Sequence, residues 1–198
     1  MKLLVATRNP GKLREVRARV RGLEVVSLDD VAPIPEVEET EDTLEGNARL
    51  KALAAARGTG LWSVADDSGL FVDALGDAPG VRSARYGPGT DADRIQKLLR
   101  AMEGVPDAER GAAFRCVLVL ASPAGEVRYA PGECRGTILR TPRGSDGFGY
   151  DPVFLLPELG RTMAELTLEE KGRLSHRARA LDALQPELAS LERSPLPN

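Results

Sequence analysis

Apolar and polar positions in the first third of the chain alternate between the spacing of a strand and the spacing of a helix. Residues 3–6 and 23–28 form short apolar runs that predict buried strands. Between them, apolar residues recur at helical spacing after an Asn-Pro pair, which favours the start of a helix. A second helical pattern, capped by Thr43, covers 44–57. The chain therefore opens with alternating strands and helices.

The rest of the chain carries further elements, and strands are most frequent in its middle. A buried strand is expected to end at Val64 and Ala65, after which Ser68 and Gly69 turn the chain. The β-rich middle is the best candidate for a second lobe or a dimer surface. The later elements expected are strands over 70–75, 112–121, 126–130 and 132–140, a helix over 90–102, a helix over 163–170 with Lys171 beyond it, and a last helix that Ser175 caps and that Pro186 ends or kinks.

Composition narrows the class of protein. The chain has 198 residues, of which 42% are hydrophobic and 29% charged, as expected for a soluble globular protein. No apolar run approaches the roughly 20 residues that span a bilayer, so no membrane partner is expected. The stretch before the first motif is too short for a signal peptide, and Cys116 and Cys134 are too few for a disulfide scaffold, which suits the cytoplasm. With a net charge of −3, no nucleic-acid partner is expected.

Two adjacent carboxylates, Asp66 and Asp67, follow the apolar residues of the buried strand. Buried carboxylates are costly unless they are paired, hydrogen-bonded or bound to a metal. In extended backbone the two side chains point to opposite faces, so one ion takes one of them and needs a second carboxylate from elsewhere. The acidic segment 29–42 is mostly a solvated loop, but one of its acids could supply that carboxylate. The alternative is a strand-to-loop turn whose acids cap backbone amides.

Rare residue types also mark candidate chemistry. Lys12, one of five lysines, lies in the first turn of the first helix, where a cation is disfavoured. Phosphate bound at this helix start would account for it, although Asn9 and Pro10 are also explained as a helix cap alone. Asn47 and Lys51 lie four residues apart on the second helix and share a face. They are either ordinary surface residues or parts of a site.

A glycine-flanked aromatic loop covers 144–152. Glycines let the backbone approach a ligand closely, and the aromatic side chains offer a stacking surface. A structural turn with a buried Phe148 explains the same residues. No helical pattern follows the loop directly, which excludes a dinucleotide-binding fingerprint. Further along the chain, His176 and Arg177 place hydrogen-bond donors at a helix start, although a lone histidine is more often structural.

Taken together, these motifs resemble the inosine triphosphate pyrophosphatase family, which removes non-canonical purine nucleoside triphosphates. One departure is visible, because the family commonly has Thr-Phe-x-Glu-Asn where this chain has Gly46 in place of the glutamate. The matching stretches occur in the family's order over most of the chain: TRNPGK (7–12), EETEDTLEGNARLKA (38–52), ADDSGL (65–70), GDAPGVRSARY (76–86), GFGYDP (147–152), MAEL with Lys171 (163–171) and SHR (175–177).

The resemblance implies a fold, an activity and an assembly. The fold is a two-lobed mixed α/β fold with a long central mixed β-sheet and a nucleotide-binding cleft between the lobes. It forms a single domain, 1–198, whose second lobe or dimerisation region covers roughly 76–145, and the chain forms a homodimer. The activity is Mg²⁺-dependent hydrolysis of ITP, dITP and XTP between the α- and β-phosphates, which yields the monophosphate and pyrophosphate.

The resemblance also implies a role for each matching residue. Asp67 would accept the proton of the attacking water, and Glu39 and Asp67 would bind Mg²⁺, so that Glu39 is the second carboxylate that strand geometry requires. Lys12 and Lys171 would stabilise charge on the phosphates, and Phe148 would stack on the purine. The triphosphate would be held by Thr7, Arg8, Asn9, Pro10, Gly11 and Lys12, and the nucleotide contacted by Ser68, Phe148, Gly149, Tyr150, Asp151, Lys171, His176 and Arg177.

Two other functions fit part of the sequence. A regulator could bind a triphosphate without cleaving it, but a pure sensor has less need of a metal site and a base. An enzyme of the same chemistry could prefer methylated or pyrimidine triphosphates. Donors from His176, Arg177 or the backbone suit the 6-keto oxygen of hypoxanthine or xanthine and oppose the 6-amino group of adenine, which favours the deaminated purines.

Overall fold

The computed structural model describes residues 1–193. The chain divides into two compact units. Among the described residues, unit 1 comprises 1–67, 116–132 and 177–193, and unit 2 comprises 68–115 and 133–176. The single domain 1–198 with a second lobe at roughly 76–145 stays a prediction, and its residues 194–198 lie outside the described residues.

One mixed sheet of eight strands runs through residues 1–193, in the order β2-β1-β3-β5-β6-β7-β8, with β4 paired to β3. β1 is parallel to β2 and β3, whereas the pairs β3–β4, β6–β7 and β7–β8 are antiparallel. The expected α/β class with a central mixed sheet is therefore confirmed. The strands are β1 (Lys2–Val5), β2 (Glu24–Ser27), β3 (Trp62–Val72), β4 (Pro79–Gly80), β5 (Gly111–Ala121), β6 (Val127–Ile138), β7 (Phe154–Leu156) and β8 (Arg161–Thr162).

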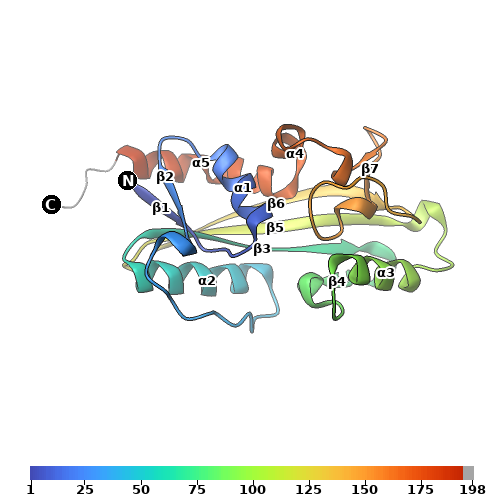
Figure 1. Cartoon of the computed structure of the whole chain (residues 1–198), viewed down its shortest axis with the longest axis horizontal. Coiled ribbons are helices and arrows are strands. Elements are labelled where there is room, and N and C mark those ends of the chain that lie inside the picture. The colour runs from blue at the N-terminus through green and yellow to red at the C-terminus, as the bar shows by residue number, and fades with distance from the viewer. Residues whose placement is uncertain (194–198) are drawn as a thin grey trace. The chain divides into compact units, whose positions relative to one another are not determined.

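Unit 1 holds helices α1 (Pro10–Arg19) and α2 (Leu44–Thr59) and, except for its first residue, α5 (His176–Arg193). α1 and α5 lie on one face of its strands and α2 lies on the other (Figure 1). Apolar side chains of α1 and α5, such as Val16 and Leu181, share a buried cluster with Val64 of β3. The strands of unit 1 are therefore covered by helices on both faces, which explains why β1 is apolar throughout its last three residues.

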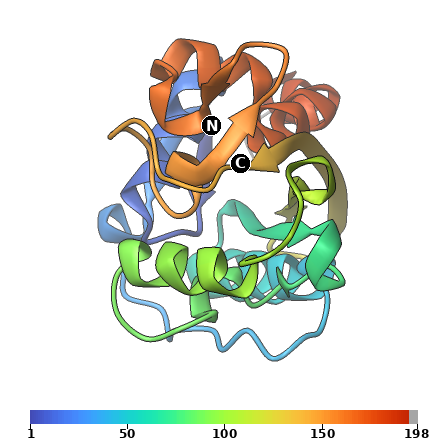
Figure 2. The ribbon, with the colours of Figure 1, turned by 90° about the vertical axis from the view of Figure 1, so that its right-hand side faces the viewer.

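Unit 2 holds helices α3 (Asp91–Ala101) and α4 (Leu168–Leu174). Figure 2 shows α3 on one side of this unit and β7 with α4 on the other. Leu98 of α3 is fully buried and belongs to the same apolar cluster as Leu70 and Phe154. Within residues 1–193, no helix of either unit is both long and apolar enough to cross a membrane.

The predicted helix starts are confirmed where the capping residue is local in sequence. The Asn9 side chain accepts hydrogen bonds from two backbone amides of the first turn of α1. Thr43 accepts one from Gly46 at the start of α2, and Thr90 forms a capping box with Asp93 at the start of α3.

The predicted turn at Ser68 and Gly69 is wrong, because β3 runs without a break from Trp62 to Val72. The separate strand over 70–75 is accordingly the end of β3 followed by a short 3₁₀ turn. Gly69 serves close approach instead of a turn, since a Cβ there would collide with the carbonyl oxygen of Gly80 on the paired strand. A glycine required by a distant neighbour cannot be distinguished locally from a turn glycine.

The predicted strands over 126–130 and 132–140 form one strand, β6, which passes through Pro131. β6 pairs with β7 through Thr137 and Ile138, near the end of β6. Pro131 lies outside that pairing, so its lack of an N–H costs no hydrogen bond to β7.

The predicted helix over 163–170 is also wrong in its bounds. The capping box of Thr162 and Glu165 is present, but it starts a 3₁₀ turn over Met163–Glu165. A new helix, α4, then begins at Leu168 and contains Lys171. The last helix starts at His176 as expected, but it continues through Pro186 to Arg193, so Pro186 does not end it.

Candidate functional site

Asp66 and Asp67 are consecutive residues of β3 in unit 1, and their side chains meet different partners. Asp66 Oδ2 lies 2.9 Å from Lys12 Nζ. Asp67 Oδ2 accepts a hydrogen bond of 3.2 Å from Asn47 Nδ2, on α2. The expectation that the two side chains point to opposite faces of extended backbone is confirmed, because Asp66 meets α1 and Asp67 meets α2, on the other face (Figure 1).

Lys12 reaches Asp66 because the Asn9 cap fixes the first turn of α1. Asn9 Oδ1 accepts from Gly11 N at 2.8 Å and from Lys12 N at 3.2 Å. The Asp66 carboxylate thus supplies an anion for a cation that the helix dipole disfavours. Phosphate binding by 7–12 stays a prediction.

Arg177 joins Asp66 to α1 through a buried ion cluster. Its side chain is 1% exposed, and its Nη2 lies 2.9 Å from Asp66 Oδ2 while its Nη1 lies 2.5 Å from Glu15 Oε2. Burial by itself raises the pKa of Asp66, but Lys12 and Arg177 outweigh it and hold the pKa well below its usual range. Burial likewise lowers the pKa of Arg177, but Asp66 and Glu15 raise it above the ordinary value, so both groups are charged. The predicted contact of Arg177 with nucleotide stays a prediction.

Cys116, on β5, lies beside this cluster with its Sγ 4.0 Å from Asp66 Oδ2. Burial and the Asp66 charge raise the pKa of the Cys116 thiol to about 12. The group is therefore a protonated thiol at neutral pH, which excludes thiolate chemistry at this position.

Asn47, which is fully buried, attaches the acidic segment to α2. Its Oδ1 accepts from the backbone N–H of Glu41 at 3.0 Å, and its Nδ2 donates to the Glu41 carbonyl at 3.1 Å as well as to Asp67. Lys51 lies one turn further along α2, with Nζ 2.7 Å from Glu39 Oε1 and 3.6 Å from Asp67 Oδ1. Glu39 and Asp67, which are far apart in sequence, thus face the same ammonium group.

The surroundings make Asp67 more basic than an ordinary aspartate. Burial raises its pKa most, and Glu39 raises it further, against the opposing effects of Lys51, Lys12 and the Asn47 hydrogen bond. Burial lowers the pKa of Lys51, but Asp67, Asp66 and Glu39 raise it above its ordinary value, so Lys51 is an ammonium ion. A partly desolvated carboxylate with a raised pKa is suited to accept a proton.

The donor set of Glu39 and Asp67 fits Mg²⁺. Both side chains offer carboxylate oxygens within 4 Å of one positive nitrogen, so both face a place where a cation is stabilised. Among residues 1–193, no group of three or more His, Cys, Asp or Glu side chains could hold a metal. Mg²⁺ requires only one or two carboxylates when water and phosphate oxygens complete its shell. Metal binding by these residues stays a prediction.

The glycine at position 46 allows the acidic segment to pack directly against α2. A Cβ at Gly46 would lie 2.6 Å from Glu41 Cβ and 3.0 Å from Thr43 Oγ1. A glutamate here, as in the family pattern, would displace the segment that carries Glu39.

In unit 2, the aromatic loop and α4 bring together Phe148, Asp151 and Lys171. Asp151 Oδ2 accepts from the Phe148 backbone N–H at 2.9 Å and from Lys171 Nζ at 2.7 Å. The same Nζ lies 4.7 Å from the centre of the Phe148 ring. Tyr150 is buried, and its hydroxyl donates to the carbonyl of Ser83 at 2.9 Å. Their predicted nucleotide contacts stay predictions.

The remaining predicted site residues lie as follows. The His176 ring stacks on Phe114, with ring centres 4.9 Å apart and planes at 17°. Ser68 follows Asp67 on β3 and is partly buried. Thr7 Oγ1 accepts from Asn9 N at 3.2 Å, Arg8 pairs with exposed Glu36, Pro10 and Gly11 begin α1, and Gly149 donates its N–H to Asp91.

Four further residues belong to these groups although the sequence prediction did not include them in the site. Asn47 and Lys51 carried a signal, because both are rare types and share a helix face. Glu15 and Asp91 carried none, since an acid on the first turns of a helix is usually solvated or a cap.

The chain belongs to the Ham1 family, whose model matches residues 3–187. It is 55% identical to a dITP/XTP pyrophosphatase of Gloeobacter violaceus over 92% of this chain and 91% of that protein. It is 53% identical to a dITP/XTP pyrophosphatase of Geobacter sulfurreducens over 94% of this chain and 96% of that protein.

Solved structures agree with this assignment. The Ham1 protein of Staphylococcus aureus is 38% identical and superposes with a TM-score of 0.85 over 96% of this chain and all of that one. A nucleoside-triphosphatase described as a dITP/XTP pyrophosphatase, from Mycobacterium abscessus, is 50% identical with a TM-score of 0.75 over 94% of this chain and all of that one.

Proposed function

We propose that this protein hydrolyses ITP, dITP and XTP between the α- and β-phosphates, yielding the monophosphate and pyrophosphate, and so removes deaminated purines from the nucleotide pool. The observation that carries the proposal is the convergence of Glu39 and Asp67 on Lys51, in a chain 55% identical to a dITP/XTP pyrophosphatase. A single acid would bind a cation weakly, whereas two acids, one of which is also suited to accept a proton, supply the parts of a phosphoanhydride hydrolase.

The catalytic part of the proposal concerns Asp67. Its raised pKa suits it to accept the proton of the attacking water, and Asn47 holds its carboxylate in place. Mg²⁺, held by Glu39 and Asp67, supplies positive charge that stabilises the phosphate oxygens. Lys51 keeps both carboxylates together through its contacts with them.

The phosphate-binding part concerns α1. Residues 7–12 place the Lys12 ammonium at the positive end of the α1 dipole, which is a favourable place for phosphate oxygens. Asp66, clamped by Arg177, fixes the position of that ammonium before substrate arrives. A preorganised cation costs no reorganisation during the reaction.

The base-binding part concerns unit 2. Phe148 offers a face for purine stacking, and Asp151 and Lys171 hold its backbone and ring in one position. Hydrogen-bond donors from His176, Arg177 or the loop backbone favour a 6-keto purine over adenine, because a buried donor facing a 6-amino group would stay unpaired. We further propose that the protein acts as a homodimer in the cytoplasm.

Pyrophosphate release from ITP, dITP, XTP, ATP, GTP and CTP, with Mg²⁺ and with EDTA, tests the proposal. The expected result is Mg²⁺-dependent release that is fastest with the three deaminated purines, and its loss in Asp67→Asn. The exposed Asp29→Asn is the matched control and should retain wild-type rates. Binding of ITP without release would identify a nucleotide sensor instead.

A further inference from the structure

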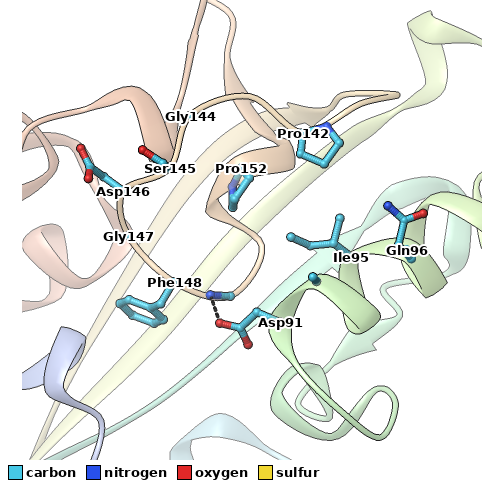
Figure 3. Close-up of a pocket in the computed structure, with 12 residues that line it drawn as sticks. Asp91, Ile95, Gln96, Pro142, Gly144, Ser145, Asp146, Gly147, Phe148 and Pro152 are labelled. Atoms are coloured by element: carbon cyan, nitrogen blue, oxygen red, sulfur yellow. Dashed lines mark hydrogen bonds between the residues drawn. The ribbon is translucent and has the colours of Figure 1, made fainter.

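The aromatic loop of unit 2 lies across from the start of α3, over a hollow. A pocket of about 270 Å³ is lined by Asp91 and Ile95 of α3 and by loop residues that include Gly147 and Phe148. Figure 3 shows one hydrogen bond that joins the two sides, drawn from the loop to the labelled Asp91. The loop that carries Phe148 is thus supported over part of its length by a hydrogen bond across a hollow.

This hydrogen bond is short and its acceptor is held in place. The Gly149 backbone N–H donates to Asp91 Oδ2 at 2.7 Å. The other carboxylate oxygen, Asp91 Oδ1, accepts from Arg94 at 2.5 Å, and Arg94 also donates to the Gly89 carbonyl at 2.9 Å. Burial raises the pKa of Asp91, but the hydrogen bonds from Arg94 and Gly149 lower it below its usual value. Asp91 is therefore an anion, and hydrogen bonds to ions are stronger than those between neutral groups.

The loop itself has little intrinsic preference for its conformation. Gly147 and Gly149 have φ angles of +83° and +61°. Glycine adopts this region readily, but it adopts other backbone conformations as readily. On one side of Gly149, Asp151 fixes Phe148 through its backbone N–H. Gly149 itself is held by its hydrogen bond to Asp91, which is 58 positions away in sequence.

We propose that Asp91 is a positioning residue for purine binding: its hydrogen bond to Gly149 holds the loop so that the Phe148 ring presents a fixed face to the base. This inference rests on the proposed function, because it assigns Phe148 to the purine. Asp91 is not a catalytic residue, since it touches the loop and not the reacting atoms.

Asp93 provides a matched control two residues further along α3. It is also an acid in the first turn, but its carboxylate accepts hydrogen bonds from the backbone N–H and the hydroxyl of Thr90, on its own helix start and not on the loop. Asp91→Ala and Asp93→Ala therefore remove the same charge from the same helix end.

The first measurement is hydrogen–deuterium exchange of the nucleotide-free protein, followed in peptides covering 142–153. Asp91→Ala is expected to speed exchange at Gly149 by about tenfold, the loss of one charge-assisted hydrogen bond. Asp93→Ala should leave exchange at Gly149 close to that of the wild type. This readout holds whether or not the protein hydrolyses ITP, so it separates failure of the loop assignment from failure of the proposed function.

The second measurement is steady-state hydrolysis of ITP. Asp91→Ala is expected to raise KM by about tenfold to a hundredfold with a smaller change in kcat, because a misplaced stacking surface weakens substrate binding. Asp91→Asn, which keeps one acceptor, should recover part of this loss. Equal KM values for Asp91→Ala and Asp93→Ala, or unchanged exchange at Gly149 in Asp91→Ala, would overturn the proposal.

Discussion

Lys51 Nζ lies 2.7 Å from Glu39 Oε1, so an acid from the segment before α2 and a lysine from inside that helix are directly paired. The same nitrogen lies 3.6 Å from Asp67 Oδ1. A partly buried lysine between two carboxylates keeps its charge, and that charge lowers the pKa of Asp67. We infer that Lys51 assembles the carboxylate pair and sets the basicity of Asp67.

Lys51→Met should shift the acid limb of the pH–rate profile upward. Removing the positive charge removes an effect that lowers the pKa of Asp67, so this pKa, already above its ordinary value, rises further. Asp67 then stays protonated up to a higher pH, so the rate of hydrolysis rises only at a higher pH than in the wild type. The measurement is kcat/KM for ITP across pH. Lys97→Met, which removes an exposed lysine of α3, should leave the pH–rate profile unchanged. If Lys51→Met has the same acid limb as the wild type, Lys51 does not set the basicity of Asp67.

Asp66→Asn should destabilise the protein by about 3–5 kcal/mol at neutral pH, because it removes the buried anion that Lys12 and Arg177 share and leaves Arg177 with Glu15 alone. The folded pKa of Asp66 lies below its ordinary value of 3.8. Its charge therefore stabilises the fold fully above that value, and the contribution declines as pH falls below it.

Urea unfolding of wild type and Asp66→Asn at several pH values checks this expectation. The stability difference should be constant between pH 7 and about pH 5 and should shrink below pH 4. A difference that grows in acid would have the wrong sign for an aspartate with a lowered pKa.

Phe148→Ala should raise KM for ITP in line with the roughly 1–3 kcal/mol that base stacking contributes, with a smaller effect on kcat. Tyr129→Ala, which removes an exposed aromatic ring of β6, is the control and should behave as wild type. Steady-state kinetics of both variants measure the difference. Should Phe148→Ala bind ITP normally, the purine lies elsewhere.

Gly69→Ala should lower the free energy of unfolding by about 1–3 kcal/mol, because the added methyl group collides with the Gly80 carbonyl. Gly172→Ala, in α4, should instead raise it by about 0.5–1 kcal/mol, since no atom beyond the adjoining helix backbone lies within 4 Å of the new Cβ and alanine favours the helix. Thermal or urea unfolding distinguishes the two. Equal effects would mean that β3 and β4 can separate at Gly69 without cost.

Local signals predicted the helix starts, and long-range contacts explain what the sequence did not reveal. Asn9 and Thr43 act within their own first turns, so their capping was visible in sequence. Gly69 was misinterpreted as a turn because its requirement comes from Gly80 on another strand. The face shared by Asn47 and Lys51 was predictable from helical spacing.

The partners of Asn47 and Lys51 could not be predicted from helical spacing. Which acid of the segment 29–42 meets Lys51 depends on how the loop packs, and in this chain the packing uses the space left by Gly46. The burial of Glu15 depends on Arg177, which is 162 residues away in sequence. Neither pairing has a periodic pattern that could reveal it.

The central claim is that Glu39 and Asp67 hold one divalent ion together. Mn²⁺ binding, followed by electron paramagnetic resonance in the presence of a non-hydrolysable ITP analogue, tests it directly in wild type, Glu39→Gln, Asp67→Asn and the control Asp29→Asn. The account predicts that Glu39→Gln and Asp67→Asn each weaken binding at least as much as the roughly 10- to 100-fold loss typical of an outer-shell partner, while Asp29→Asn binds as wild type. Wild-type Mn²⁺ affinity in either Glu39→Gln or Asp67→Asn would contradict it.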